Sequence, residues 1–267
     1  DLYIQDKYVY VSLQHKDKNG LTINLYRAEL DYKNLTFELF FKTNEYWPKY
    51  NVFSGGRIEK FLNNKILFSI GFSKVYDAPQ NESSLLGKII SIDLNTKKHE
   101  LVSLGHRNPQ GLFFLESKKL IANTEHGPFG GDEVNFNYFK ENNVKNFGWP
   151  EVSYGAAYKG EGALFKPDTF KKTHLEKGYE EPFKYFVPSI GISELFLNPK
   201  NNNLYVSSLR AGSIYFYELN EDLSKISSED RIFFGDQRIR DLDYDAENDL
   251  FFVLLEFTPS IGILSNN

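Results

Sequence analysis

Cysteine is absent from the 267-residue sequence, which excludes disulfide bonds and thiol chemistry. Long hydrophobic runs are absent too, since no stretch approaches about 18 consecutive apolar residues, and no membrane-spanning helix is predicted. Neither sign of charge dominates, because 31 basic and 36 acidic residues leave a formal net charge of −5. This mild acidic balance gives no electrostatic reason to expect a nucleic acid or an anionic membrane as a partner.

Methionine is absent as well, even at the first position, and the sequence shows no signal peptide. The chain opens with "DLYIQDKYVYVSL", which is typical of the inside of a β-strand. We therefore expect either a mature, trimmed chain or a sequence from which upstream residues are missing.

Aromatic residues are abundant, with 24 Phe and 17 Tyr, and this bias favours strands over helices. Short apolar strand cores recur along the chain as "KYVYVSL", "KILFSIG", "KLIANTE", "NLYVSSL" and "LFFVLLE". They begin at residues 7, 65, 119, 203 and 250, so the intervals are roughly 58, 54, 84 and 47 residues. Polar turns such as "ESKK" and "NPKNNN" join most of them to a preceding strand, as in hairpins.

Four short strands per unit of roughly 40 to 50 residues are typical of a β-propeller blade, so one all-β propeller domain is predicted over residues 1–267. An antiparallel sandwich, which also has short strands at regular spacing, is the alternative. The wide third interval contains a loop-rich insertion at about residues 137–180. Such loops often carry function on a propeller face.

The stretch "GHRNPQGL", residues 105–112, is too polar for a plain strand start. It contains His106, Arg107, Asn108 and Gln110, whose cationic and amide groups suit a planar, oxygen-rich or anionic ligand. An ordinary polar loop with surface charges is the alternative interpretation.

A second polar stretch, "NTEHGPFGGDEVNF", covers residues 123–136. Its glycines free the backbone and Pro128 removes an amide donor, so carbonyl oxygens can point inward. Hard cations such as Ca²⁺ bind such carbonyls together with carboxylates. Asp132 and Glu133 are either ligands of such an ion or groups that orient their neighbours.

Arginines mark two further segments, "SSLRAGSIYFYEL" and "QRIRDLDY". Arg238 and Arg240 are two residues apart and share one face of a strand. If these segments begin blades, Arg107, Arg210, Arg238 and Arg240 converge at one end of the propeller channel. Four cations there favour a polyanionic small molecule, whereas separate structural salt bridges are the alternative.

Other chemistries lack their motifs. The sequence has no G-x-S-x-G, no P-loop and no G-x-G-x-x-G. Zinc binding is not expected, because the five histidines (15, 99, 106, 126 and 174) show no H-x-x-x-H spacing.

Five motifs in order resemble the soluble quinoprotein glucose/sorbosone (aldose sugar) dehydrogenase family: "GHRNPQGL", "EHGPFGGDEVN", "NFGWPEVSYG", "PSIGISEL" and "QRIRDLDYDAENDLFFVLLE". The resemblance runs from about Ser54 to Glu256. It implies a six-bladed propeller that uses pyrroloquinoline quinone (PQQ) and Ca²⁺ to transfer a hydride from C1 of a small-molecule sugar to the quinone. It also implies a periplasmic or secreted location, and it leaves the electron acceptor unknown.

The resemblance carries roles over by position. Gly127 and Pro128 match the family's carbonyl ligands of the catalytic Ca²⁺, and Arg107 is expected to be catalytic. The positions that match cofactor contacts are Arg107, Asn108, Gln110, His126, Arg210, Arg238 and Arg240.

Two departures from the family pattern are visible. Active members carry a histidine base four residues before the Arg of "GGR", and here Phe53 stands in that place. The chain also begins within what resembles the second blade, so the first blade is expected to be missing or incomplete and about four and a half blades to be present. A non-catalytic propeller that binds a sugar, an anionic ligand or a protein is therefore the alternative function.

Overall fold

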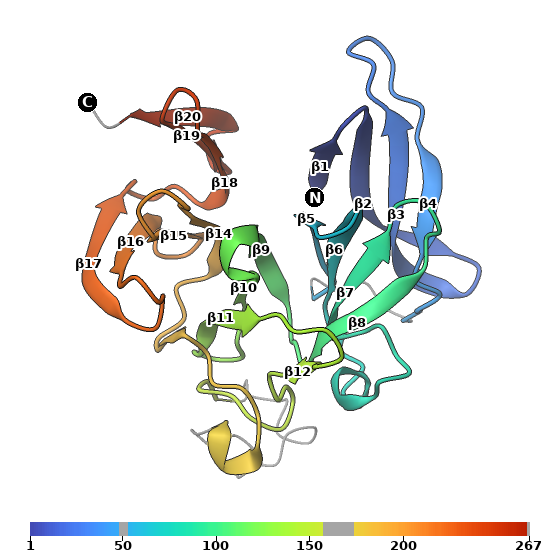
Figure 1. The fold of residues 1–267 in the computed structure, drawn as a ribbon, viewed down its shortest axis with the longest axis horizontal. Helices are drawn as coiled ribbons and strands as arrows, with labels where there is room; N and C mark the ends of the chain where they lie inside the picture. Colours follow the sequence, from blue (N-terminus) through green and yellow to red (C-terminus); the bar gives the residue numbers. More distant parts are fainter. Residues whose placement is uncertain (48–52, 157–173, 266–267) are drawn as a thin grey trace.

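Five β-sheets follow one another along the chain and form the blades of a β-propeller (Figure 1). The structure is a computed structural model that describes residues 1–47, 53–156 and 174–265. In Figure 1 the blades lie in chain order around an arc, with the first and last blades at its two ends. This arrangement confirms the predicted all-β propeller.

The blades are defined by their strands. Blade 1 consists of β1 (Leu2–Gln5), β2 (Tyr8–Asp17), β3 (Gly20–Glu29) and β4 (Glu38–Lys42). Blade 2 consists of β5 (Gly55–Phe61), β6 (Lys65–Ile70), β7 (Lys88–Asp93), β8 (His99–Leu104) and β12 (Lys145–Asn146). Blade 3 consists of β9 (Pro109–Leu115), β10 (Leu120–Glu125), β11 (Asp132–Tyr138) and β13 (Lys184–Phe186). Blade 4 consists of β14 (Ile192–Leu197), β15 (Asn203–Ser208), β16 (Ser213–Leu219) and β17 (Ile226–Phe233). Blade 5 consists of β18 (Ile239–Asp245), β19 (Leu250–Leu255) and β20 (Ser260–Ser265).

The recurring apolar segments of the sequence are the second strands of the five blades: β2, β6, β10, β15 and β19. Four blades have at least four strands and blade 5 has three among the described residues, and blade 1 itself has four. The six-blade count and an incomplete first blade remain predictions.

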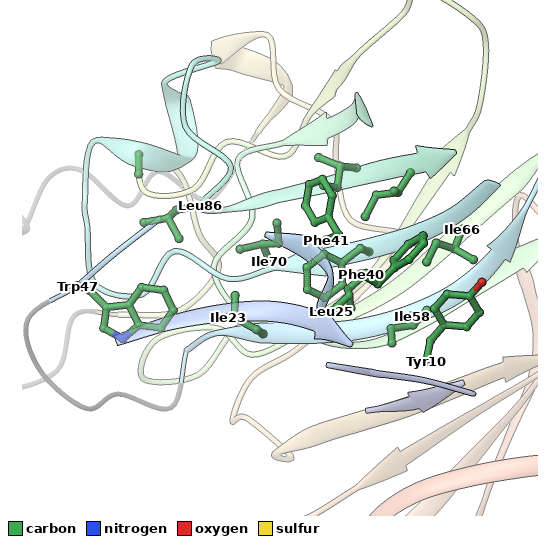
Figure 2. Close-up of a cluster of buried hydrophobic side chains, with 14 residues drawn as sticks. Tyr10, Ile23, Leu25, Phe40, Phe41, Trp47, Ile58, Ile66, Ile70 and Leu86 are labelled. Carbon is green, nitrogen blue, oxygen red and sulfur yellow. The ribbon is translucent and has the colours of Figure 1, made fainter. Parts of the chain in front are cut away.

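Apolar side chains between neighbouring blades form the core. Across blade 2, Phe68 lies opposite Ile58 on one side and Ile90 on the other, and all three are buried. Tyr10 and Phe40 of blade 1 pack against this row, as Figure 2 shows for the cluster that joins blades 1 and 2. Pairs of side chains that lie opposite each other on neighbouring strands stabilise a sheet. The alternation of apolar and polar residues along each strand therefore determines which side chains pack between the blades.

The loop-rich insertion adds one strand to a neighbouring blade. Within it, β12 pairs in parallel with β8, with Lys145 opposite Ser103. The part of the insertion at residues 157–173 lies outside the described residues. Helical segments in the described ranges are the 3₁₀ turns η1 (Ala78–Gln80), η2 (Glu116–Lys118) and η3 (Leu175–Lys177), and none of them has the length or hydropathy to cross a membrane.

The innermost strands β5, β9, β14 and β18 are spatial neighbours. The beginnings of these strands therefore meet at one end of the propeller axis. The predicted site stretches "GHRNPQGL" and "QRIRDLDY" lie at the beginnings of β9 and β18, whereas residues 123–136 connect β10 to β11 and Arg210 lies between β15 and β16.

Candidate functional site

A cavity of about 480 Å³ lies where the innermost strands begin, and its volume is within the range of small-molecule sites. Four of its lining residues are arginines and one is an acid, Asp132. The lining residues are Phe53, Arg107, Asn108, Gln110, His126, Gly127, Asp132, Ser189, Gly191, Leu209, Arg210, Arg238 and Arg240. This excess of cationic side chains favours an anionic ligand.

The cavity brings together the seven residues that the sequence predicts as cofactor contacts, and Phe53 and Gly127 join them. Pro128 is not part of this wall. It lines a small adjoining space of about 10 Å³ together with Arg107, Gly127, Glu125 and Glu133. The roles of these residues in cofactor and metal binding remain predictions.

Arg107 is buried in the cavity wall rather than exposed as in an ordinary polar loop. Its guanidinium carbon lies 4.6 Å from the ring centre of Phe53 and 5.3 Å from that of Trp149. Its Nη1 donates to the carbonyl oxygen of His126 at 2.9 Å. Stacking on two aromatic rings and a bond to a neighbouring loop fix the direction of this cation.

His106, next to Arg107, is turned away from the cavity and is fully buried. Its Nδ1 lies 2.8 Å from Glu125 Oε2, and its Nε2 lies 2.8 Å from the hydroxyl of Ser103. The other oxygen of Glu125 accepts a 2.6 Å hydrogen bond from the Arg107 amide. His106 and Glu125 therefore support the loop that carries Arg107.

Two amide side chains lie next to Arg107 at the start of β9. Gln110 Nε2 donates to Asn108 Oδ1 at 3.2 Å, and the same oxygen accepts from the Gly55 amide at 3.3 Å. Asn108 thus joins the beginning of blade 3 to the beginning of blade 2. The amide groups of Asn108 and Gln110 are placed to orient a polar ligand beside the arginines.

Arg238 and Arg240 lie on one face, as their spacing predicts, and share a carboxylate. Arg238 Nε lies 3.2 Å and Arg240 Nη2 2.7 Å from Oε2 of Glu256. Burial acts to raise the pKa of Glu256, but the Arg240 and Arg238 guanidiniums outweigh it and hold that pKa below its usual value. Arg210 is exposed and forms no ion pair within the described part of the chain, so one cation of the cavity is available to a ligand.

The glycine-rich loop is organised by Asp132. Its Oδ1 accepts from the Gly127 amide at 3.1 Å, and its Oδ2 accepts from the amides of Gly191 and Ile192 at 2.8 and 3.1 Å. Burial acts to raise the pKa of Asp132, but His126, whose Nδ1 lies 3.8 Å away, and the Ile192 amide outweigh burial and lower that pKa. Asp132 thus orients the loop, and its role as a metal ligand remains a prediction.

Gly127 allows the loop to close on itself. A Cβ at this position would lie 2.0 Å from the carbonyl oxygen of Gly131, a distance that no side chain tolerates. Glycine is thus required at position 127 for the close approach of the backbone to Gly131.

Glu133 lies on the other side of the loop, and its carboxyl is buried. Burial raises the pKa of Glu133 well above its usual value, and the nearby Glu125 carboxylate raises it further. Within residues 1–47, 53–156 and 174–265, no group of three or more His, Cys, Asp or Glu side chains could hold a metal ion.

Sequence reasoning did not identify several residues of the cavity and its surroundings. Ser189, Gly191 and Leu209 line the wall, and Trp149 stacks on Arg107. The motifs "PSIGISEL" and "NFGWPEVSYG" contain or adjoin most of these positions, but the type of residue alone does not indicate a role in the wall.

Comparison with known proteins gives one family. The sequence model for "Glucose / Sorbosone dehydrogenase" matches residues 2–258. The chain is 27% identical over 270 residues to an uncharacterised protein of Synechocystis, slr1608, covering 90% of this chain and 62% of the relative. It is 28% identical over 209 residues to the aldose sugar dehydrogenase YliI of Escherichia coli, covering 70% of this chain and 53% of the relative. The chain thus spans little more than half the length of these relatives.

Solved structures share the fold. A crystal structure of a glucose dehydrogenase superposes with a TM-score of 0.81 at 24% identity, covering 98% of this chain and 79% of that one. The PQQ-bound aldose sugar dehydrogenase of Streptomyces coelicolor superposes with a TM-score of 0.71 at 20% identity, covering 97% of this chain and 75% of that one.

Proposed function

Because the chain belongs to the glucose/sorbosone dehydrogenase family, we propose that it is part of a PQQ-dependent aldose sugar dehydrogenase. The observation that carries the proposal is the cavity wall, in which Arg107, Arg210, Arg238 and Arg240 surround one space. PQQ is a planar tricarboxylate, and guanidinium groups bind carboxylates through paired charge-assisted hydrogen bonds. A relative with the same fold has been solved with PQQ bound.

Different residues of the cavity would hold different parts of the cofactor. The arginines would bind its carboxylates, and Asn108, Gln110 and His126 would orient its polar edge. Arg107, already fixed by Phe53 and Trp149, stays in place without reorganisation. When bound, the quinone would supply the oxidising chemistry, as an acceptor for a hydride from C1 of the sugar.

Calcium is a separate part of the proposal. Gly127 lines the cavity and Pro128 lines the adjoining space, so a Ca²⁺ ion at this loop would use their carbonyls together with oxygens of the cofactor. The protein is further proposed to be periplasmic or secreted, as the family resemblance implies.

A second candidate function is a binding module without catalysis, and Phe53 favours it. A phenyl ring lines the cavity at the position of the family's histidine base, and it cannot accept the proton of the sugar hydroxyl. Such a protein would retain the anion-binding wall for a carboxylate ligand.

A titration of the purified protein with PQQ, with and without Ca²⁺, followed by excess aldose, distinguishes these functions. Calcium-dependent binding and reduction of the quinone by sugar are expected for the dehydrogenase. Binding without reduction would support the binding module, and absence of binding would refute both uses of the cavity for PQQ.

A further inference from the structure

Arg57 is a buried arginine beside the cavity, in the "GGR" segment of β5. Its Nε donates to the carbonyl oxygen of Gln110, a residue whose side chain lines the cavity. Its Nη2 lies 3.5 Å from the carbonyl oxygen of Arg240, a second residue of the cavity wall. The Arg57 side chain is 12% exposed, so these bonds form largely away from solvent.

Carboxylates from three other blades surround the same guanidinium. Nη1 lies 2.8 Å from Glu194 Oε2 on β14 and 2.8 Å from Asp241 Oδ2 on β18. It also lies 3.3 Å from Oδ1 of Asp1, directly before β1. Together with Gln110 of β9, these partners connect Arg57, which lies in blade 2, to each of the four other blades.

The carboxylates are themselves fixed in direction. The second oxygen of Glu194 accepts from the amides of Leu112 and Leu195 at 3.1 and 2.9 Å. Gly111 makes this approach possible, because a Cβ there would lie 2.7 Å from that oxygen. Asp241 accepts from the Leu242 amide at 3.0 Å. Arg57 is thus held by groups that belong to the strands, and it holds those strands in turn.

A buried ion pair is poor support for a purely stabilising role, because desolvation offsets much of its Coulomb energy. A planar guanidinium is instead suited to fixing several partners in one plane, since its five donors have a rigid geometry. Two of the strands that Arg57 contacts, β9 and β18, carry the cavity residues Gln110 and Arg240.

We propose that Arg57 is the positioning residue of the cavity. Arg57 bonds the main chain at Gln110 and Arg240 and pairs with Glu194 and Asp241. In this way it fixes the distances between cavity side chains of different blades, so that they can contact the same anionic ligand. The proposal rests on the proposed function only in that the ligand of the cavity is anionic.

The test measures anion affinity in Arg57→Lys, which keeps the charge but has a single ammonium that cannot reach all these partners. Arg27→Lys is the matched control, since Arg27 pairs with Glu38 at 2.7 Å in blade 1 and its contacts lie within that blade. Dissociation constants for citrate and for PQQ are measured by titration calorimetry well below the melting temperature of each variant. A merely structural role would lower the melting temperature and leave these constants unchanged.

We expect Arg57→Lys to bind both anions at least about tenfold more weakly, with Arg27→Lys unchanged. If Arg57→Lys does not fold, Glu194→Ala decides, because it keeps the guanidinium and removes one of its partners, and weaker anion binding is again expected. Unchanged affinity in the folded variants would overturn the proposal, and so would absence of binding of either anion to the unsubstituted protein. Binding of citrate and PQQ without oxidation of sugar would refute the catalytic function alone.

Discussion

Replacing Phe53 with histidine tests whether the cavity lacks only a proton acceptor. The Phe53 ring lies 4.6 Å from the guanidinium carbon of Arg107 and 5.6 Å from the ring of Phe72, so an imidazole placed there lines the same cavity. A positioned general base contributes about 10²–10⁴ to a rate. We therefore expect Phe53→His to raise kcat for aldose oxidation by about 10²–10⁴. The lost cation–π contact costs only about 1 kcal/mol of stability.

The pH dependence of this variant follows from Arg107. A unit charge 4.6 Å from the imidazole repels its protonated form by about 1 kcal/mol even at the dielectric constant of water. The pKa of the introduced histidine is therefore expected to lie below its ordinary value of about 6.5. Because the neutral imidazole is the base, kcat should rise with pH through that pKa and be constant above neutrality.

The assay is dye-linked oxidation of glucose by protein loaded with PQQ and Ca²⁺, with the sugar at saturation. Phe53→Leu is the control, since it also removes the ring but supplies no base. Equal kcat values for Phe53→His and Phe53→Leu would refute the interpretation that Phe53 replaces the base. A gain in both variants would instead mean that the phenyl ring obstructs the sugar.

Three further predictions concern the ligand, pH and the core. Arg210→Gln should weaken PQQ binding about tenfold, or about 1.4 kcal/mol, because the variant loses the charge-assisted bond that the exposed Arg210 can offer. Calorimetry at low and high salt should show that binding to the variant depends less on salt. Unchanged affinity would mean that Arg210 does not contact the ligand. Burial raises the pKa of Glu194 to about 8, although Arg57 acts to lower it, and burial raises the pKa of Glu133 well above its usual value. Between about pH 4.5 and 8 the folded protein therefore binds more protons than the unfolded chain, so the free energy of unfolding in urea should fall as pH rises over this interval. Glu194→Gln should make this decline shallower, and a rise of the free energy of unfolding over the same interval would contradict both pKa shifts. Phe68 lies in the buried row that joins blades 1 and 2, so Phe68→Ala should lower the free energy of unfolding in urea by about 3–5 kcal/mol. A decrease of less than about 1 kcal/mol would contradict the packing described.

The propeller could be predicted from the sequence because the pattern that specifies each pair of strands lies within a short stretch of the chain. Each second strand is a short apolar run followed or preceded by a polar turn, and "GLFFLESKKLIANTE" forms β9, η2 and β10 as that pattern indicates. The cavity residues were predictable for a related reason, since a propeller brings the beginnings of its inner strands together. Arg107 and Arg240 are 133 residues apart in the chain and line one cavity.

Other features depend on partners that the sequence does not pair. The "GGR" arginine is visible as a motif, but its contacts with Glu194 and Asp241 span 137 and 184 residues. Pro128 follows Gly127 directly, yet the turn places it on the adjoining space rather than the cavity. Register shifts and turn directions decide such placements, and they are set by packing between blades.

The parallel pairing of β12 with β8 has a consequence for the order of folding. The Phe147 amide donates to the Leu104 carbonyl at 2.9 Å, and the Trp149 amide donates to the Gly105 carbonyl at 2.9 Å, so a segment that lies between β11 and β13 of blade 3 in the chain is anchored on blade 2. Trp149 reaches Arg107 only when both blades are formed and the intervening chain has returned. The Trp149 contact with Arg107 therefore requires the chain through Trp149 to have folded back onto blade 2, and a nascent chain that ended after β8 would hold much of the core of blade 2 without this contact.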